Sequence, residues 1–196
     1  MIRIAIFASG SGTNAQRITE YFRERPGFIS VDLILSNRKD AFVLERAKNL
    51  GVPCITFSRL EFYESNLIPD LLKQYAIDYV VLAGFLWLVP DSVLKVFPDK
   101  ILNIHPALLP AYGGKGMFGM RVHEAVISHQ DKESGITVHI VNSRYDEGNI
   151  LFQAKCTISE TETPESLAQK IHGLEYEYFP RVIEHYILKG DAFHEL

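Results

Sequence analysis

The sequence predicts an α/β protein built on a mostly parallel β-sheet, with helices on both faces and an antiparallel edge. Short apolar segments alternate with amphipathic segments of helix length, which is typical of parallel strands joined by right-handed crossovers. The opening segment, residues 2–8, is apolar apart from Arg3, as a strand buried on both faces should be. Only a short polar segment separates two later strands, at 135–142 and 149–157, so we expect them to pair antiparallel.

The other elements follow from the same patterns, within a single domain expected to cover residues 1–196. Further strands are expected at residues 29–36, 53–57, 78–84 and 100–105. Helices are expected at residues 14–24, 41–50, 60–75, 121–129 and from 164 into the 180s. Ligands of such sheets bind outside the carboxyl ends of the strands. The first candidates for a site therefore follow Ala8, Ser36, Leu82 and Asn103.

The composition is that of an ordinary globular protein, with 196 residues, 47% hydrophobic residues and a net charge of −4. No apolar run approaches the roughly 18 residues of a membrane helix, and the first residues lack the segments of a signal peptide. The mild acidity argues against nucleic acid as a main partner. Cys54 and Cys156 are far apart, without metal-ligand spacing, and suit a reducing compartment. We expect a cytoplasmic protein with neither a membrane nor a nucleic-acid partner.

The first strand runs into a glycine-rich turn, residues 10–15 (GSGTNA), that opens a helix. Its backbone N–H groups and the positive end of the helix dipole favour an anion, and we expect a phosphate there rather than a turn with no ligand. A dinucleotide would need an acidic residue at the end of the second strand, where Ser36-Asn37-Arg38-Lys39 stands. This excludes NAD, whereas Arg38 or Lys39 leaves an NADP-dependent oxidoreductase as an alternative.

Asn103 and His105 are the most informative polar residues. They lie two apart in one strand and therefore share a face, and Pro106 then ends the strand. An amide donor beside an imidazole suits a carbonyl oxygen that becomes an oxyanion. Asp146, between the last two strands, is a candidate to orient His105 and raise its pKa, or to accept a proton from an attacking amine. The alternative is that all three only satisfy hydrogen bonds at a strand end and a turn.

Three segments resemble the folate-dependent formyltransferases. They are VLAGFLWLVP at 81–90, ILNIHPALLPAYGG at 101–114 and SGITVHIVNSRYDEGNILFQAK at 134–155. The resemblance covers nearly the whole chain, and Asn103, His105 and Asp146 match the catalytic residues of that family in order and spacing. It implies a Rossmann-like formyltransferase fold. The SGSGTN loop, and a length of 196 residues that leaves no room for further domains, most resemble the branch that formylates glycinamide ribonucleotide.

The resemblance implies that the chain transfers the formyl group of 10-formyltetrahydrofolate to the amine of glycinamide ribonucleotide in de novo purine biosynthesis. Asn103 and a protonated His105 would stabilise the oxyanion, Asp146 would receive the amine proton, and no metal would take part. The residues implied to hold the phosphate and ribose are Gly12, Thr13, Asn14, His172 and Glu175. The residues implied to contact the folate are Arg59, Phe85, Leu86, Trp87, Leu88, Val89, Val141 and Tyr145. The partners would be these two small molecules, with the chain a monomer or a homodimer.

The sequence departs from the family pattern in two places. Trp87 stands where many members carry arginine, and the segment at 113–126 is longer than the compact loop of other members. That segment forms either part of a lid or an exposed elaboration. His123 and His139 are expected to be structural or exposed. Besides the NADP-dependent enzyme, the alternatives are a family member with another acceptor, a deformylase, and a non-catalytic folate- or nucleotide-binding protein.

Overall fold

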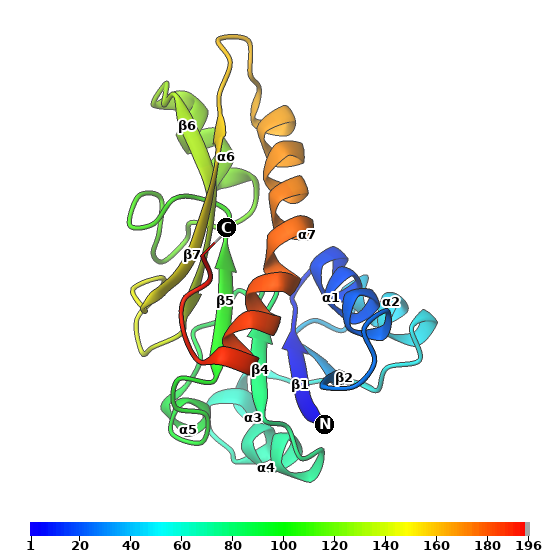
Figure 1. Cartoon of the computed structure of the whole chain (residues 1–196). Coiled ribbons are helices and arrows are strands. Elements are labelled where there is room, and N and C mark those ends of the chain that lie inside the picture. The colour runs from blue at the N-terminus through cyan, green and yellow to red at the C-terminus, as the bar shows by residue number, and fades with distance from the viewer. Residues whose placement is uncertain (195–196) are drawn as a thin grey trace. The chain divides into compact units, whose positions relative to one another are not determined.

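The computed structural model describes residues 1–194 (Figure 1). Seven strands form a sheet in the order β3-β2-β1-β4-β5-β6-β7. Contacts divide the chain into two compact units, residues 1–103 and the residues from Ile104 onward. Strand β5 (Ile101–His105) continues from the first unit into the second. The expectation of one domain over the whole chain stays a prediction.

The first unit is a parallel sheet whose strands alternate with helices. Besides the start of β5, its strands are β1 (Ile2–Phe7), β2 (Ile29–Ser36), β3 (Cys54–Thr56) and β4 (Tyr79–Leu82). Its helices are α1 (Thr13–Arg23), α2 (Val43–Asn49), α3 (Arg59–Tyr63), α4 (Leu67–Gln74) and α5 (Asp91–Leu94). Strand β1 pairs parallel with both β2 and β4, and residues 4–7 are all buried. The part of the strand enclosed in this way has no solvent face, which explains the apolar run from Ile4 to Phe7, whereas Arg3 is exposed.

The second unit begins inside β5 and contains an antiparallel strand pair covered by a long helix. Its further elements are α6 (Met120–Ser128), β6 (Glu133–Ile140), β7 (Ile150–Thr157) and α7 (Pro164–Lys189). Strands β6 and β7 pair antiparallel, as predicted. Helix α7, orange to red in Figure 1, contacts both strands and α6. Thr163 caps its start, with Pro164 in the first turn, and the predicted extent of this helix is confirmed.

The helix predicted at 60–75 is wrong, because the chain forms α3 and α4 there instead. Helix α3 begins at a capping box in which Ser58 and Glu61 bond to each other's backbone N–H groups. Beyond it, the Ser65 hydroxyl donates to the Glu61 carbonyl at 2.7 Å and accepts from the Leu67 N–H at 3.2 Å. The side chain therefore takes over backbone bonds that a continuous helix would make. Helix α5, a single turn after Pro90, was not predicted.

The predicted fold class, a mostly parallel sheet with an antiparallel edge, is confirmed. The carboxyl ends of β1, β4 and β5 lead into the glycine turn, the segment at 83–89 and His105 with the residues after it. These are the positions that the rule for parallel sheets selects for a site. None of the helices among residues 1–194 is both long and apolar enough to span a membrane.

Candidate active site

The glycine turn after β1 ends at Gly12, which precedes the first residue of α1. Gly12 is left-handed, with φ of 74°, and its carbonyl accepts the Gln16 N–H at 2.9 Å. A Cβ atom at this position would lie 2.4 Å from Cγ2 of Val43, so the close approach of α2 requires glycine here. The first N–H groups of a helix have no intrahelical acceptor, and no described side chain caps α1. The turn therefore has the geometry of an anion-binding site.

Ser9 joins this turn to the segment after β4. Its N–H donates to the Gly84 carbonyl at 3.0 Å, and its hydroxyl accepts the Leu86 N–H at 3.1 Å. The side chain of Ser9 is buried. The loops at the ends of two neighbouring strands are thus fixed to each other, which places residues 84–86 beside the glycine turn.

An aromatic cluster extends from this segment. It is formed by Phe7, Phe57, Phe62, Tyr63, Phe85 and Trp87, whose neighbouring ring centroids are 5.0–6.4 Å apart. The guanidinium of Arg59 lies 5.0 Å from the Tyr63 ring centroid and 5.8 Å from that of Trp87, within cation–π range. The Tyr63 hydroxyl donates to the Leu88 carbonyl at 3.0 Å. Trp87 therefore lies at the partly exposed end of a mostly buried aromatic cluster, beside the cation of Arg59.

His105 ends β5 and is almost completely buried. Its Nδ1 lies 3.5 Å from Oδ2 of Asp146, and its Nε2 lies 2.7 Å from the Tyr112 carbonyl oxygen. The Gly114 N–H donates to the same carboxylate at 2.9 Å. Asp146 follows β6 in a left-handed conformation with φ of 57°. The structure thus brings the carboxylate of Asp146 to the ring of His105.

His139 is a third member of this cluster, and the sequence analysis missed it. The ring is buried in β6, with Nε2 3.6 Å from Oδ1 of Asp146 and Nδ1 3.0 Å from the Ile140 carbonyl oxygen. The signal was present, because Thr137 and His139 are polar residues at alternate positions of the strand, among the apolar residues Ile136, Val138 and Ile140. Asp146 therefore lies between two imidazole rings, which we call the His105–Asp146–His139 cluster.

The hydrogen bonds of this cluster determine where its protons lie. A carbonyl oxygen only accepts, so His105 carries a proton on Nε2 and His139 carries one on Nδ1. The remaining nitrogen of each ring faces the carboxylate of Asp146. A further proton on either nitrogen creates an N–H donor to that carboxylate. The cluster can therefore take up one proton from a reacting group and return it.

Burial is the largest influence on the pKa of His105 and lowers it below the ordinary 6.5. Asp146 raises the pKa of His105, as the sequence analysis expected, but this effect is smaller. Burial also acts to raise the pKa of Asp146, but the contacts that favour its ionised form, with His139, with the charge of a protonated His105 and with the Gly114 N–H, outweigh burial, and the pKa falls below 3.8. At neutral pH, Asp146 is therefore ionised and His105 is mostly a neutral proton acceptor. The expectation that Asp146 keeps His105 charged is corrected accordingly.

Thr137 fixes the segment that follows His105. Its hydroxyl donates to the Ala107 carbonyl at 2.7 Å and accepts the Leu109 N–H at 3.0 Å. Gln153 on β7 donates to the same hydroxyl at 2.9 Å and to the Leu109 carbonyl at 3.0 Å. The antiparallel pair thus holds the chain on leaving β5, which restrains the direction of the His105 ring.

The other predicted residues fall on both units. Gly12, Thr13 and Asn14 start α1, Arg59 starts α3, and residues 85–89 follow β4, all in the first unit. Asn103 is the last residue of that unit and precedes His105 by two positions on β5. In the second unit, Val141 and Tyr145 lie in the connection that carries Asp146, whereas His172 and Glu175 lie on α7. Glu175 is buried and His172 is exposed. Residues 1–194 contain no group of three or more His, Cys, Asp or Glu side chains that could hold a metal ion.

His123 on α6 is buried, contrary to one of the two expectations for it. Burial lowers the pKa of His123 to about 4, and the nearby charges of His172 and His105 act in the same direction. An unfolded chain binds a proton at this histidine near pH 6.5, so the unfolded state is favoured as the pH falls below that value. This residue therefore makes the protein less stable in mild acid.

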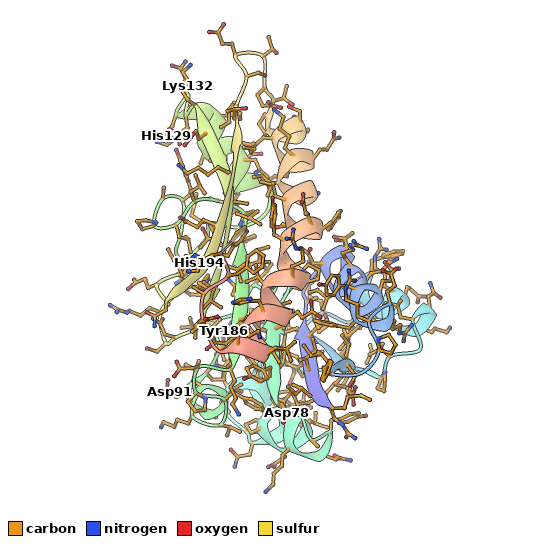
Figure 2. All side chains as sticks on the ribbon, in the orientation of Figure 1. Asp78, Asp91, His129, Lys132, Tyr186 and His194 are labelled. Atoms are coloured by element: carbon orange, nitrogen blue, oxygen red, sulfur yellow. The ribbon has the colours of Figure 1, made fainter. Side chains whose placement is uncertain are left out.

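Through His123, the wild type should lose about 2 kcal/mol of unfolding free energy between about pH 7 and about pH 5. We expect His123→Leu to abolish this part of the loss. Urea unfolding at both values measures the difference. His129, labelled in Figure 2, is an exposed histidine at the end of the same helix, and His129→Leu serves as the control. An unchanged pH dependence in the His123 variant, or an equal change in the control, would contradict the prediction.

Comparison with known proteins shows which family the chain resembles. The sequence pattern of the family described as formyl transferase matches residues 2–183. "Phosphoribosylglycinamide formyltransferase, chloroplastic" of Arabidopsis thaliana is 39% identical over 186 residues, covering 92% of this chain and 64% of the relative. The chain thus spans less than two thirds of that plant protein.

Two bacterial proteins are similar over nearly their whole length. "Phosphoribosylglycinamide formyltransferase" of Bacillus subtilis (strain 168) is 34% identical over 189 residues, covering 94% of each chain. The crystal structure of "glycinamide ribonucleotide transformylase 1" from Symbiobacterium toebii superposes with a TM-score of 0.86 at 37% identity, covering 95% of this chain and 87% of that one. The chain therefore belongs to the formyl transferase family.

Proposed function

We propose that this chain transfers the formyl group of 10-formyltetrahydrofolate to the amine of glycinamide ribonucleotide, a step of purine synthesis. The observation that carries the proposal is the His105–Asp146–His139 cluster, because its partly buried carboxylate faces two buried imidazole rings that can hold a transferred proton. The cluster lies at the carboxyl end of β5, where parallel sheets bind ligands. The relatives from Arabidopsis and Bacillus carry the name of this activity.

The glycine turn supports a phosphorylated acceptor. Gly12 and the start of α1 direct backbone N–H groups outward, and Thr13 and Asn14 add polar side chains at the same helix end. Glycinamide ribonucleotide carries a phosphate, whereas an amino-sugar acceptor need not. The glycine turn therefore favours the ribonucleotide among acceptors of the family. His172 and Glu175 would contribute to its phosphate and ribose.

The segment at 85–89 suits a folate. Leu86 is exposed and Trp87 half-buried, with the buried side chains of Phe85 and Val89 beside them in the sequence, and this aromatic and aliphatic character fits a flat heteroaromatic ring. Val141 and Tyr145 would contribute from the connection after β6. Arg59 stands beside that surface with a charge that fits the acidic tail of a folate. The residues present therefore match both ends of the proposed co-substrate.

The proposed chemistry needs a stabilised oxyanion and a mobile proton. Asn103 would donate its side-chain N–H to the oxygen that becomes negative when the neutral amine attacks the formyl carbon. Asp146 would receive the proton that the amine loses and pass it to Nδ1 of the mostly neutral His105, and the carboxylate would then stabilise the imidazolium that results. The imidazolium would then return this proton to the departing nitrogen of the folate. Protons balance, and no covalent bond to the enzyme is required.

The NADP alternative relied on Arg38 or Lys39 as a partner for a 2′-phosphate. Of these two, Arg38 already has an acidic partner, because its Nη2 lies 2.8 Å from Oδ2 of Asp40 in an exposed ion pair. The hydrogen bonds that Arg38 donates to Asp40, together with the negative charge of that carboxylate, raise the pKa of Arg38. A phosphate would have to displace this carboxylate.

The test follows the folate absorbance of purified protein with 10-formyltetrahydrofolate, in the presence and absence of glycinamide ribonucleotide. We expect loss of the formyl group only when the acceptor is present, with stoichiometric formylation of its amine. Loss without acceptor would identify a deformylase instead. No reaction in either mixture from folded protein would contradict the proposed function.

A further inference from the structure

Helix α2 binds the two peptide groups that precede Gly12. The N–H of Val43, its first residue, donates to the Gly10 carbonyl at 3.1 Å. Nε of Arg46, about one turn later, donates to the Ser11 carbonyl at 2.8 Å. Nη1 of the same arginine donates to the side-chain oxygen of Gln16 on α1. Arg46 therefore connects the glycine turn, α1 and α2.

These bonds determine where the N–H groups of the turn point. The C=O and N–H of a trans peptide point in opposite directions. The Gly10 carbonyl shares a peptide group with the Ser11 N–H, and the Ser11 carbonyl shares one with the Gly12 N–H. Because both carbonyls are bound by α2, both N–H groups face away from it. Consecutive N–H groups turned to one side form the concavity that binds anions.

Neighbouring groups restrain the side chain of Arg46 beside the glycine turn. It is half-buried, and its guanidinium lies 5.0 Å from the ring centroid of Phe42, a cation–π contact. Its bond to a backbone carbonyl is charge-assisted and stronger than one between neutral groups. The positive charge also lies behind the turn, on the side opposite to the outward N–H groups, and adds to the attraction for an anion.

We infer that Arg46 is a positioning residue for the acceptor's phosphate, acting through the Ser11–Gly12 peptide group. The inference rests on the proposed function, in which that phosphate binds at the start of α1. It predicts that Arg46 matters for phosphorylated acceptors and not for the formyl transfer itself. This dependence on the phosphate of the acceptor distinguishes Arg46 from a residue that only stabilises the fold.

The first test measures steady-state kinetics of Arg46→Met with two acceptors, glycinamide ribonucleotide and the phosphate-free glycinamide riboside. We expect KM for the ribonucleotide to rise about tenfold while kcat stays within about twofold, because one charge-assisted bond orients the turn. With the riboside, kcat/KM should change by less than about twofold, because no phosphate is present to respond. Arg46→Lys keeps the charge but loses the planar donor, so its KM for the ribonucleotide should lie between those of the wild type and Arg46→Met.

Arg23→Met is the matched control. Arg23 also joins α1 to the region of α2 by donating to a backbone carbonyl, that of Leu50, but it does so at the other end of α1. Arg23→Met should therefore leave the ratio of kcat/KM for the two acceptors unchanged. An equal rise in KM for both acceptors, or the same effect in the Arg23 variant, would overturn the inference. If Arg46→Met does not fold, the comparison with Arg46→Lys decides it.

A second measurement is independent of formyl transfer. Inorganic phosphate alone should raise the Tm of the wild type, and raise that of Arg46→Met much less. This result would support the inference even if the wild type failed to formylate the ribonucleotide. That failure would contradict only the proposed function. Equal stabilisation of both proteins by phosphate, or of neither, would overturn the role of Arg46.

Discussion

Replacing Asp146 with asparagine is expected to lower kcat by about 10³-fold, within the usual range for loss of acid–base assistance. The amide has nearly the same shape, can still accept the Gly114 N–H and tolerates the left-handed conformation of this position. It carries no charge, so a proton that moves to His105 during the reaction would no longer be stabilised. Single-turnover measurements with saturating acceptor report this step directly.

The neighbouring Glu147 provides the control for that variant. It lies in the same connection and forms an exposed ion pair with Arg144, with Nε 3.0 Å from Oε2. Glu147→Gln removes one charge at nearly the same place and should leave kcat within about twofold, because exposed pairs contribute little. A kcat of the Asp146 variant within threefold of the wild type, with normal folding, would show that the cluster does not handle the reacting proton.

Replacing Asn103 with alanine is expected to lower kcat by about 10²–10³-fold, the usual effect of losing one oxyanion donor. The KM values should change little, because the donor acts mainly on the charge that develops in the transition state. Asn103 precedes His105 on β5 and pairs in register with Leu82. Kinetics together with thermal unfolding would distinguish loss of the donor from loss of the strand.

Asn66→Ala is a suitable comparison for that measurement. Asn66 is exposed and precedes α4, without a side-chain bond that caps the helix. The same substitution there should leave kcat near the wild-type value. A wild-type kcat in the Asn103 variant would remove this residue from the proposed mechanism, whereas a parallel fall in Tm and kcat would assign it to the strand.

Local patterns were sufficient to predict most of the fold and the centre of the site. The apolar run of β1, the glycine turn and the polar pair Asn103 and His105 each depend on residues close together in the sequence. Periodicity and turn composition respond to such short-range order. The split of the helix at 60–75 was missed for a local reason of another kind, because the Ser65 hydroxyl competes with the backbone for its hydrogen bonds.

The part that could not be predicted depends on residues brought together by tertiary structure. His139 reaches Asp146 only because the connection after β6 turns back along that strand. The pKa of His105 falls because surrounding segments bury its ring, and no pattern around residue 105 measures that burial. Thr137 reads as an ordinary strand residue, yet its hydroxyl makes three hydrogen bonds to the segment after His105 and to Gln153. Such contacts determine the chemistry of the site more than they determine the fold.

The placement of Arg59 over Tyr63 and Trp87 has a consequence for the entropy of binding. A free arginine side chain has about 2 kcal/mol of rotamer entropy to lose when it is immobilised. Here the two rings restrain the guanidinium as the protein folds, before any ligand arrives. A carboxylate that binds this guanidinium would meet a cation with little conformational freedom left to give up. In the proposed function, Trp87 would thus link the order of the folded protein to the strength with which the acidic tail of the folate is held.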